Sequence, residues 1–192
     1  MSGTREYDVV VHGATSFVGQ ILCRYLVRRH GTDGSLRWAI AGRDPVKLDR
    51  VAADSGADVP RLIADAADRD ALDQITSATG VVVSTVGPYA LDGSELVASV
   101  VEAGGDYCDL TGEVQWMRRM IDAHQNRAEE TGARIVHACG FDSIPSDLGN
   151  WVTQQRAIER FGAPCVEVRM SVKGANGGVS GGNAASGMKM FE

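Results

Sequence analysis

One stretch near the start of the chain decides the fold: Asp8-Val-Val-Val-His12 runs directly into Gly13-Ala-Thr-Ser-Phe-Val-Gly19. The first part is a β-branched run that predicts a buried strand, and the second predicts a tight turn that opens a helix. Backbone N–H groups at a helix N-terminus bind a pyrophosphate, and glycine is needed where the backbone must come close to it. We therefore expect a dinucleotide-binding loop. Its residues are Gly13, Ala14, Thr15, Ser16, Phe17, Val18 and Gly19.

The loop departs from the usual glycine-rich pattern at its middle position, where Ser16 replaces a glycine. The side chain of Ser16 crowds a phosphate slightly, but its hydroxyl can donate a hydrogen bond to one. A strand before the loop and a helix after it make the motif specific. The alternative is a glycine-rich turn between strand and helix that binds no ligand.

Short β-branched runs alternate with amphipathic helical patterns as far as Phe141. This alternation predicts an α/β fold, a Rossmann-type doubly wound parallel sheet with helices on both faces. The predicted strands are residues 8–12, 37–41, 61–64, 81–85, 107–110 and 134–138. Each helix between them is expected to turn one apolar stripe toward the sheet. In the first helix this stripe is Val18, Ile21, Leu22, Tyr25 and Leu26.

The end of the second predicted strand indicates which dinucleotide binds. An NAD site normally has an acidic residue there for the ribose hydroxyls, whereas this chain reads Ala41-Gly42-Arg43-Asp44. The planar, permanently charged guanidinium of Arg43 suits a 2′-phosphate. We expect Gly42 and Arg43 to contact the cofactor and NADP(H) to be preferred, with NAD(H) as the alternative. In the opposing interpretation Arg43 is solvated and Asp44 only caps a helix.

Two further segments are expected at the same edge of the sheet. Asp65 follows the third predicted strand, where it can accept a hydrogen bond from the adenine amino group or serve as a surface turn residue. Ser84-Thr-Val-Gly-Pro-Tyr89 follows the fourth, beside the point where the strand order reverses and ligands bind. Its residues expected to line the ribose and nicotinamide side are Thr85, Val86 and Gly87. The alternative is a tight turn at Gly87-Pro88 without a ligand.

The pattern changes after the sixth strand. Ser143-Ile-Pro-Ser-Asp147 predicts a helix start with a capping side chain and a proline in the first turn, and residues 165–172 alternate as a strand. From Gly174 the chain is rich in Gly, Ser and Asn before it ends in Met188-Lys-Met-Phe-Glu192. We expect a dinucleotide-binding domain at 1–141. Residues 142–192 are expected to be a connecting helix and the truncated start of an α+β substrate domain.

Composition excludes several classes of protein. The net charge is −6 and no basic stripe is visible, which argues against a nucleic-acid partner. No signal peptide or apolar run of about 20 residues occurs, so a cytoplasmic protein is expected, with membrane association only through a part not present here. The cysteines form no CxxC pair and no metal site is predicted. Tyr-x-x-x-Lys, Gly-x-Ser-x-Gly and HExxH active-site motifs are not found in a suitable context.

Six motifs in order resemble the saccharopine dehydrogenase family, in the branch of the actinobacterial trans-acting enoyl reductases. Three of them are the loop at 13–19, Ala41-Gly-Arg43 and the turn at 84–89. The other three are Tyr107-Cys-Asp-Leu-Thr-Gly-Glu113, Cys139-Gly-Phe-Asp-Ser-Ile-Pro-Ser-Asp147 and Gly177-Gly-Val-Ser-Gly-Gly182. The resemblance implies that a substrate mouth is framed by Tyr107, Asp109, Glu113, Phe141, Asp142 and Ser143. The alternative is that these residues are helix caps and turn residues. The resemblance also implies reduction of a carbon–carbon double bond in a lipid or polyketide intermediate carried by a separate synthase.

Such a reduction needs hydride delivery to the β-carbon and protonation of the α-carbon. Tyr89 is the candidate proton donor; the alternative is that it is a packing aromatic residue. We therefore expect an NAD(P)-dependent oxidoreductase whose present fragment is inactive alone, with a carrier-bound acyl substrate, a polyketide synthase as partner, and a homodimer as a further expectation. The alternatives are a saccharopine dehydrogenase or reductase, and a dinucleotide-binding module without catalysis.

Overall fold

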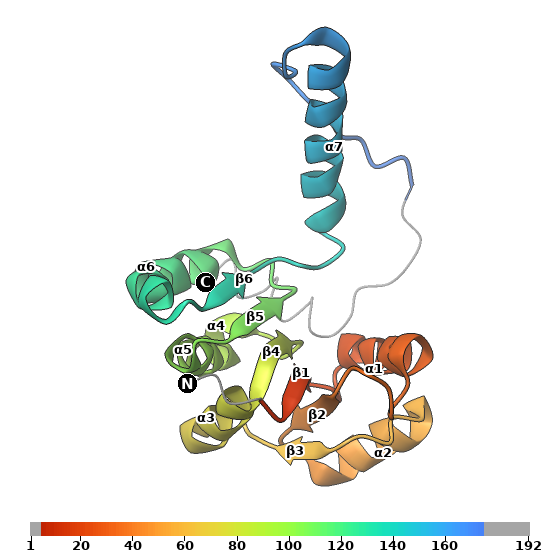
Figure 1. Ribbon diagram of the computed structural model, residues 1–192, viewed down its shortest axis with the longest axis vertical. Helices are drawn as coiled ribbons and strands as arrows, with labels where there is room; N and C mark the ends of the chain where they lie inside the picture. Colours follow the sequence, from red (N-terminus) through yellow and green to blue (C-terminus); the bar gives the residue numbers. More distant parts are fainter. Residues whose placement is uncertain (1–4, 175–192) are drawn as a thin grey trace.

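The computed structural model describes residues 5–174, in which six strands form one parallel sheet in the order β3-β2-β1-β4-β5-β6 (Figure 1). The strands are β1 Tyr7–His12, β2 Trp38–Gly42, β3 Arg61–Ile63, β4 Thr79–Ser84, β5 Asp106–Asp109 and β6 Arg134–Val136. The order reverses direction between β1 and β4, which is the switch point of a doubly wound sheet. The predicted Rossmann-type fold is confirmed.

All six predicted strands exist, and their ends differ from the prediction by at most two residues. The largest shift at a strand start is in β4, which begins at Thr79 because this residue pairs with Tyr7 of β1. Glycine at position 80 hides this start from an apolar-run criterion. Strand ends therefore depend on the neighbouring strand, which a local pattern does not contain.

Helices cover both faces of the sheet (Figure 1). On one face lie α1 Phe17–His30 and α2 Pro45–Ser55, which pack with β1 and β2 around Val11, Ile40 and Leu48. On the other lie α3 Arg69–Ala78, α5 Ser94–Ala103 and α6 Val114–Thr131, around Leu72, Leu96 and Trp116. A short helix, α4 Tyr89–Asp92, precedes α5. These two apolar layers fix the carboxyl ends of the strands, where the candidate site lies.

Helix α1 turns a different face toward the sheet than the predicted stripe. Its buried residues are Gly19, Cys23 and Leu26, whereas Ile21 and Tyr25 are 45% and 47% exposed. A Cβ on Gly19 would lie 2.4 Å from the carbonyl oxygen of Gly13, so the helix backbone itself packs against the loop. This close contact sets the rotation of α1. A glycine contact adds no apolar side chain to the pattern, which is why the predicted stripe was wrong at these two positions.

Helix α7, Ile144–Phe161, projects away from the sheet (Figure 1). Pro145 lies in its first turn as predicted, but Ser143 makes no side-chain capping hydrogen bond, so the predicted cap is wrong. Ser143 has helical dihedral angles (φ −109°, ψ −46°) instead of the extended ones with which a cap reaches the following N–H groups. The predicted domain boundary at 141/142 falls between β6 and α7.

The strand predicted at 165–172 does not form. No strand lies beside this segment in the part of the chain that the structure describes, and the side chains of Val166 and Val172 are exposed. Alternation alone does not make a strand, because its backbone groups need a partner. Here Cys165 folds back on α7, where its N–H and carbonyl pair with the side-chain amide of Gln154 at 2.7 and 3.2 Å. The predicted glycine-rich segment lies outside the described residues after Gly174.

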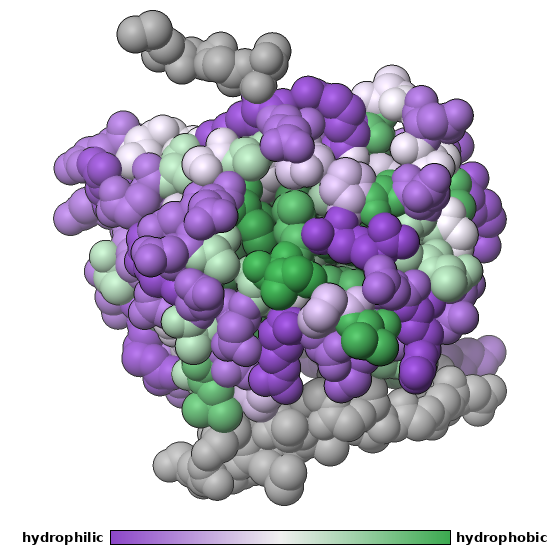
Figure 2. Space-filling model, turned by 90° about the horizontal axis from the view of Figure 1, so that it is seen from below, coloured by the Kyte–Doolittle hydropathy of each residue, from purple (hydrophilic) through white to green (hydrophobic). Residues whose placement is uncertain are grey.

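The surface seen from below in Figure 2 is mostly hydrophilic around a limited apolar area. The edge strand β3 and the neighbouring helix α2 contribute exposed apolar side chains, among them Ile63 and Val46. Across residues 5–174, no helix is long and apolar enough to span a membrane. No cluster of three or more His, Cys, Asp or Glu side chains suited to a metal ion occurs among these residues.

Candidate dinucleotide site

A cleft of about 290 Å³ opens at the carboxyl ends of β1 to β4. It lies across the switch point of the sheet, where α/β proteins of this topology bind ligands. Nine of the residues predicted to contact the cofactor line it: Gly13, Thr15, Ser16, Gly42, Arg43, Asp65, Thr85, Val86 and Gly87. Four loops that are far apart in the sequence thus meet at one cavity.

The other four predicted contacts, Ala14, Phe17, Val18 and Gly19, do not line the cleft directly. Ala14 is fully buried beneath the loop, and Phe17 is 67% exposed at the start of α1. Phe17, Val18 and Gly19 form the first turn of α1, whose N–H groups have no acceptor within the helix. Of these three N–H groups, that of Gly19 is bonded to Oγ of Ser16.

Gly13 cannot be replaced by a larger residue without a change in the loop. Its φ of +86° lies in the left-handed region that disfavours side chains. An added Cβ would lie 2.6 Å from Cγ2 of Val86 and 2.9 Å from Oγ1 of Thr85. The loop after β1 and the turn after β4 therefore touch at Gly13, and together they form a cradle in which a phosphate can meet the backbone.

Ser16 is tied into the scaffold by both of its hydrogen-bonding functions. Its Oγ accepts the N–H of Gly19 at 2.9 Å, which caps α1, and donates to Oγ1 of Thr85 at 2.9 Å. Thr85 in turn donates to the carbonyl of Gly13 at 2.8 Å. The sequence suggested that the Ser16 hydroxyl can donate to a phosphate, but in this structure its hydrogen is directed to Thr85.

Arg43 and Asp65 lie on the β2–β3 side of the cleft. The guanidinium Nη1 and the carboxylate Oδ2 are 4.0 Å apart, and the Arg43 side chain is 81% exposed. Asp44 caps α2 by accepting the N–H of Lys47 at 3.1 Å, so the cap considered as the alternative does form. Capping by Asp44 leaves Arg43 in the wall of the cleft. The capping role of Asp44 is therefore confirmed, whereas the contact of Arg43 with a cofactor stays a prediction.

Four residues of the cleft wall were not predicted: His12, Ala64, Ala66 and Asp92. His12 ends β1 and is 2% exposed, with both ring nitrogens lacking a hydrogen-bond partner. Burial lowers the pKa of its imidazole to about 4, against the opposite influence of the Ala64 backbone and the Asp65 carboxylate. The imidazole is therefore neutral near pH 7. A polar residue that closes an apolar strand was the only signal for it in the sequence.

Tyr89 lies behind the turn and away from the cavity. It is 4% exposed, donates its hydroxyl hydrogen to the carbonyl of Ser84 at 3.1 Å, and packs its ring 5.5 Å from that of Trp116. Burial, together with the nearby charge of Asp109, raises the pKa of the phenol, which stays protonated. The structure thus gives Tyr89 a packing contact and a bond that holds the turn.

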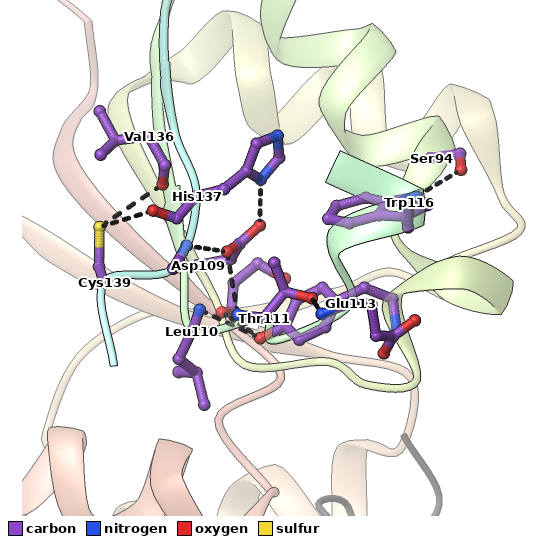
Figure 3. A network of polar contacts seen from close by, with 12 residues as sticks. Ser94, Asp109, Leu110, Thr111, Glu113, Trp116, Val136, His137 and Cys139 are labelled. Atoms are coloured by element: carbon purple, nitrogen blue, oxygen red, sulfur yellow. Dashed lines mark hydrogen bonds and ion pairs between the residues drawn. The ribbon is translucent and has the colours of Figure 1, made fainter. Parts of the chain in front are cut away.

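A buried polar network lies behind this turn, at the ends of β5 and β6 (Figure 3). Asp109 Oδ2 is 2.6 Å from Nδ1 of His137, and Asp109 Oδ1 accepts the N–H groups of Thr111 and Ala138. The His137 ring meets Trp116 edge-on, with 5.0 Å between the ring centres. His137 thus links β6 to the end of β5 through a hydrogen bond to Asp109 and a ring contact with Trp116.

The fold and the cleft define the class of protein: a Rossmann-type nucleotide-binding fold. No family model matches the chain. Curated relatives are similar in sequence over nearly the whole of this chain, and their names are more specific than the fold. A Mycobacterium tuberculosis protein provisionally named a trans-acting enoyl reductase is 42% identical over 190 residues, which make up 97% of this chain and 45% of that protein. A Mycobacterium leprae protein named a trans-acting enoyl reductase is 41% identical over 95% of this chain and 44% of its own length.

The resemblance inferred from the motifs is therefore confirmed at the level of named relatives. Among solved structures, apo saccharopine dehydrogenase (L-Glu forming) from Saccharomyces cerevisiae matches with a TM-score of 0.65 and 20% identity, over 81% of this chain and 32% of that one. This likeness supports the fold alone. The chain spans less than half the length of these curated relatives.

Proposed function

We propose that this chain forms the NADP(H)-binding part of an oxidoreductase that reduces a carbon–carbon double bond in a carrier-bound lipid or polyketide intermediate. The cleft carries the proposal, because nine residues chosen from cofactor chemistry alone line one cavity at the switch point. The relatives named trans-acting enoyl reductases support the reaction. Their name also suggests a separate partner, for which we propose a polyketide synthase.

The residues present fit a dinucleotide. The first turn of α1 would offer the backbone N–H groups of Phe17 and Val18 to a pyrophosphate, and Gly13 leaves no side chain in the way. The N–H groups of Gly13 and Gly19 are bonded to the Ala41 carbonyl and to Oγ of Ser16. The exposed guanidinium of Arg43 would bind the 2′-phosphate, which a carboxylate at this position would repel. The nearby Asp65 would keep Arg43 over the cleft and accept a hydrogen bond from the adenine.

Thr85, Val86 and Gly87 would line the ribose on the nicotinamide side, because their turn borders the cleft next to β1. When bound, the reduced nicotinamide supplies the hydride for the β-carbon. Tyr89 remains the predicted proton donor for the α-carbon, a role that requires its hydroxyl to leave the Ser84 carbonyl. We propose that most of the substrate wall belongs to the substrate domain that begins after 141. We therefore expect this fragment alone to be inactive.

Turnover by the full-length protein tests this function. We expect it to oxidise NADPH when given an acyl carrier loaded with an α,β-unsaturated thioester, and to yield the saturated thioester in equal amount. Mass spectrometry of the carrier and the loss of NADPH absorbance measure both sides of the reaction. NADPH binding without turnover of any enoyl thioester would favour the non-catalytic module instead. Turnover of an amino-diacid substrate would favour the saccharopine dehydrogenase alternative.

A further inference from the structure

Glu113 is a buried carboxylate that lies outside the cleft yet holds one of its walls. It is 3% exposed and sits directly before α6. Its two oxygens accept the backbone N–H groups of Tyr89 and Ala90, at 2.9 and 2.8 Å. These residues begin α4, immediately after the turn at 84–88 that supplies Thr85, Val86 and Gly87 to the cleft. The turn is therefore anchored from behind by a charge.

The anchor is itself held by a series of hydrogen bonds that reaches β5 and β6 (Figure 3). The N–H of Glu113 donates to Oγ1 of Thr111, and the N–H of Thr111 donates to Oδ1 of Asp109, both at 3.1 Å. The second oxygen of Asp109 meets His137, and the Asp109 side chain is fully buried. Because each link is buried and directional, the position of Glu113 is fixed by the sheet rather than by solvent.

Hydrogen bonds to a charged acceptor are shorter and stronger than neutral ones. Two of them converge on the start of α4 from one carboxylate, so this segment has little freedom to move relative to β5. An amide in place of the carboxylate keeps its shape but offers one acceptor and one donor. Its NH₂ would then face one of the two N–H groups, and the turn would have to shift away.

We propose that Glu113 is a positioning residue of the cofactor site, which holds the turn at 84–88 where it contacts the nicotinamide half of the dinucleotide. The inference rests on the proposed function, since that function assigns the cleft to NADP(H). Arg43, directly after β2, would bind the adenosine half of the dinucleotide, and its ion pair is with Asp65 rather than with this network. A change at Glu113 should therefore weaken the contacts with the nicotinamide half of the ligand and leave those with the adenosine half unchanged.

Two ligands separate the halves of the site: NADPH, and adenosine 2′,5′-bisphosphate, which carries only the adenosine and its 2′-phosphate. We expect Glu113→Gln to weaken NADPH binding about tenfold, as the loss of one charged hydrogen bond predicts. Binding of the bisphosphate should stay within about twofold of the wild type, because its contacts lie with Arg43. Glu159→Gln, on exposed α7, is the matched control and should change neither affinity.

Calorimetric titration gives both dissociation constants, and circular dichroism checks the fold. If Glu113→Gln weakens the binding of both ligands equally, Glu113 is a general structural residue and the inference is overturned. Unchanged NADPH binding in the variant would also overturn it. If the wild type binds neither ligand, the proposed function fails and takes the inference with it. If Glu113→Gln does not fold, Thr111→Val removes the hydroxyl that orients Glu113 and should give the same split with a smaller loss.

Discussion

Ser16 and Thr85 are 69 residues apart in the sequence, and a hydrogen bond of 2.9 Å between their hydroxyl oxygens joins the two sides of the cleft. Ser16 belongs to the loop after β1, and Thr85 to the turn after β4. The serine stands where the common motif has a glycine, and it caps α1 at the same time. At this position the chain thus lacks the conformational freedom of a glycine and has instead a side-chain hydrogen bond between two loops.

Replacing Ser16 with alanine removes both the cap and the link to Thr85. A lost N-cap costs about 1 kcal/mol and a lost hydrogen bond about another 1 kcal/mol, so we expect the free energy of unfolding to fall by about 2 kcal/mol. Urea unfolding measures it. Ser16→Gly is the comparison variant, because glycine keeps most of the capping preference and should lose about half as much. An alanine variant as stable as the wild type would contradict the role of the link.

The buried imidazole of His12 predicts a specific dependence of stability on pH. Its pKa in the folded protein is about 4, below the ordinary value of 6.5 that applies when the chain is unfolded. Between these values the unfolded state binds more protons, so stability decreases as pH falls from about 6.5 to about 4. His12 lowers the free energy of unfolding by up to about 1.4 kcal/mol for each pH unit in this range, and by on the order of 3 kcal/mol in total.

His12→Leu isolates this contribution, because the carboxylates that also titrate in acid are the same in both proteins. Urea unfolding at a series of pH values should show a steeper loss of stability toward acid pH in the wild type than in the variant. The difference in free energy of unfolding between variant and wild type should grow, in favour of the variant, from pH 6.5 to pH 4. A difference independent of pH would show that His12 is not buried as a neutral ring.

The contacts of Tyr89 predict a change in stability when its hydroxyl is removed. Tyr89→Phe keeps the ring against Trp116 but leaves the carbonyl of Ser84 without its donor. We expect a loss of about 1 kcal/mol in the free energy of unfolding and NADPH binding within about twofold of the wild type. In the full-length protein the same variant tests the predicted proton donor. Turnover that survives at the wild-type rate would remove Tyr89 from that role.

Much of the site could be predicted because it is built from ends of consecutive strands. Gly13, Arg43 and Asp65 each come after a strand that a short apolar run identifies, and parallel strands bring their carboxyl ends to one edge. The loop chemistry is also local, since a positive φ at Gly13 and a cap at Ser16 each depend on neighbouring residues. The strand order then brings the residues that these local patterns predict together at one cavity.

The remaining features depend on contacts between distant parts of the chain. The rotation of α1 follows from Gly19 against Gly13, and the anchoring of the turn follows from Glu113, which is 24 residues from Tyr89. The alternating segment at 165–172 lacks a neighbouring strand among the described residues and so forms none. His12 looks like an ordinary strand end in the sequence. All four features depend on contacts with distant residues, and no pattern within a short stretch of sequence predicts such contacts.

We propose that the cleft binds NADP(H) and that the guanidinium of Arg43 binds its 2′-phosphate. Calorimetric titration with NADPH and with NADH tests it, on the wild type, on Arg43→Ala and on Arg50→Ala as a matched control from exposed α2. We predict that the wild type and Arg50→Ala bind NADPH at least about tenfold more tightly than NADH, and that Arg43→Ala loses this preference while its NADH affinity is kept. Failure of the folded wild type to bind either dinucleotide, or a preference that survives in Arg43→Ala, would contradict it.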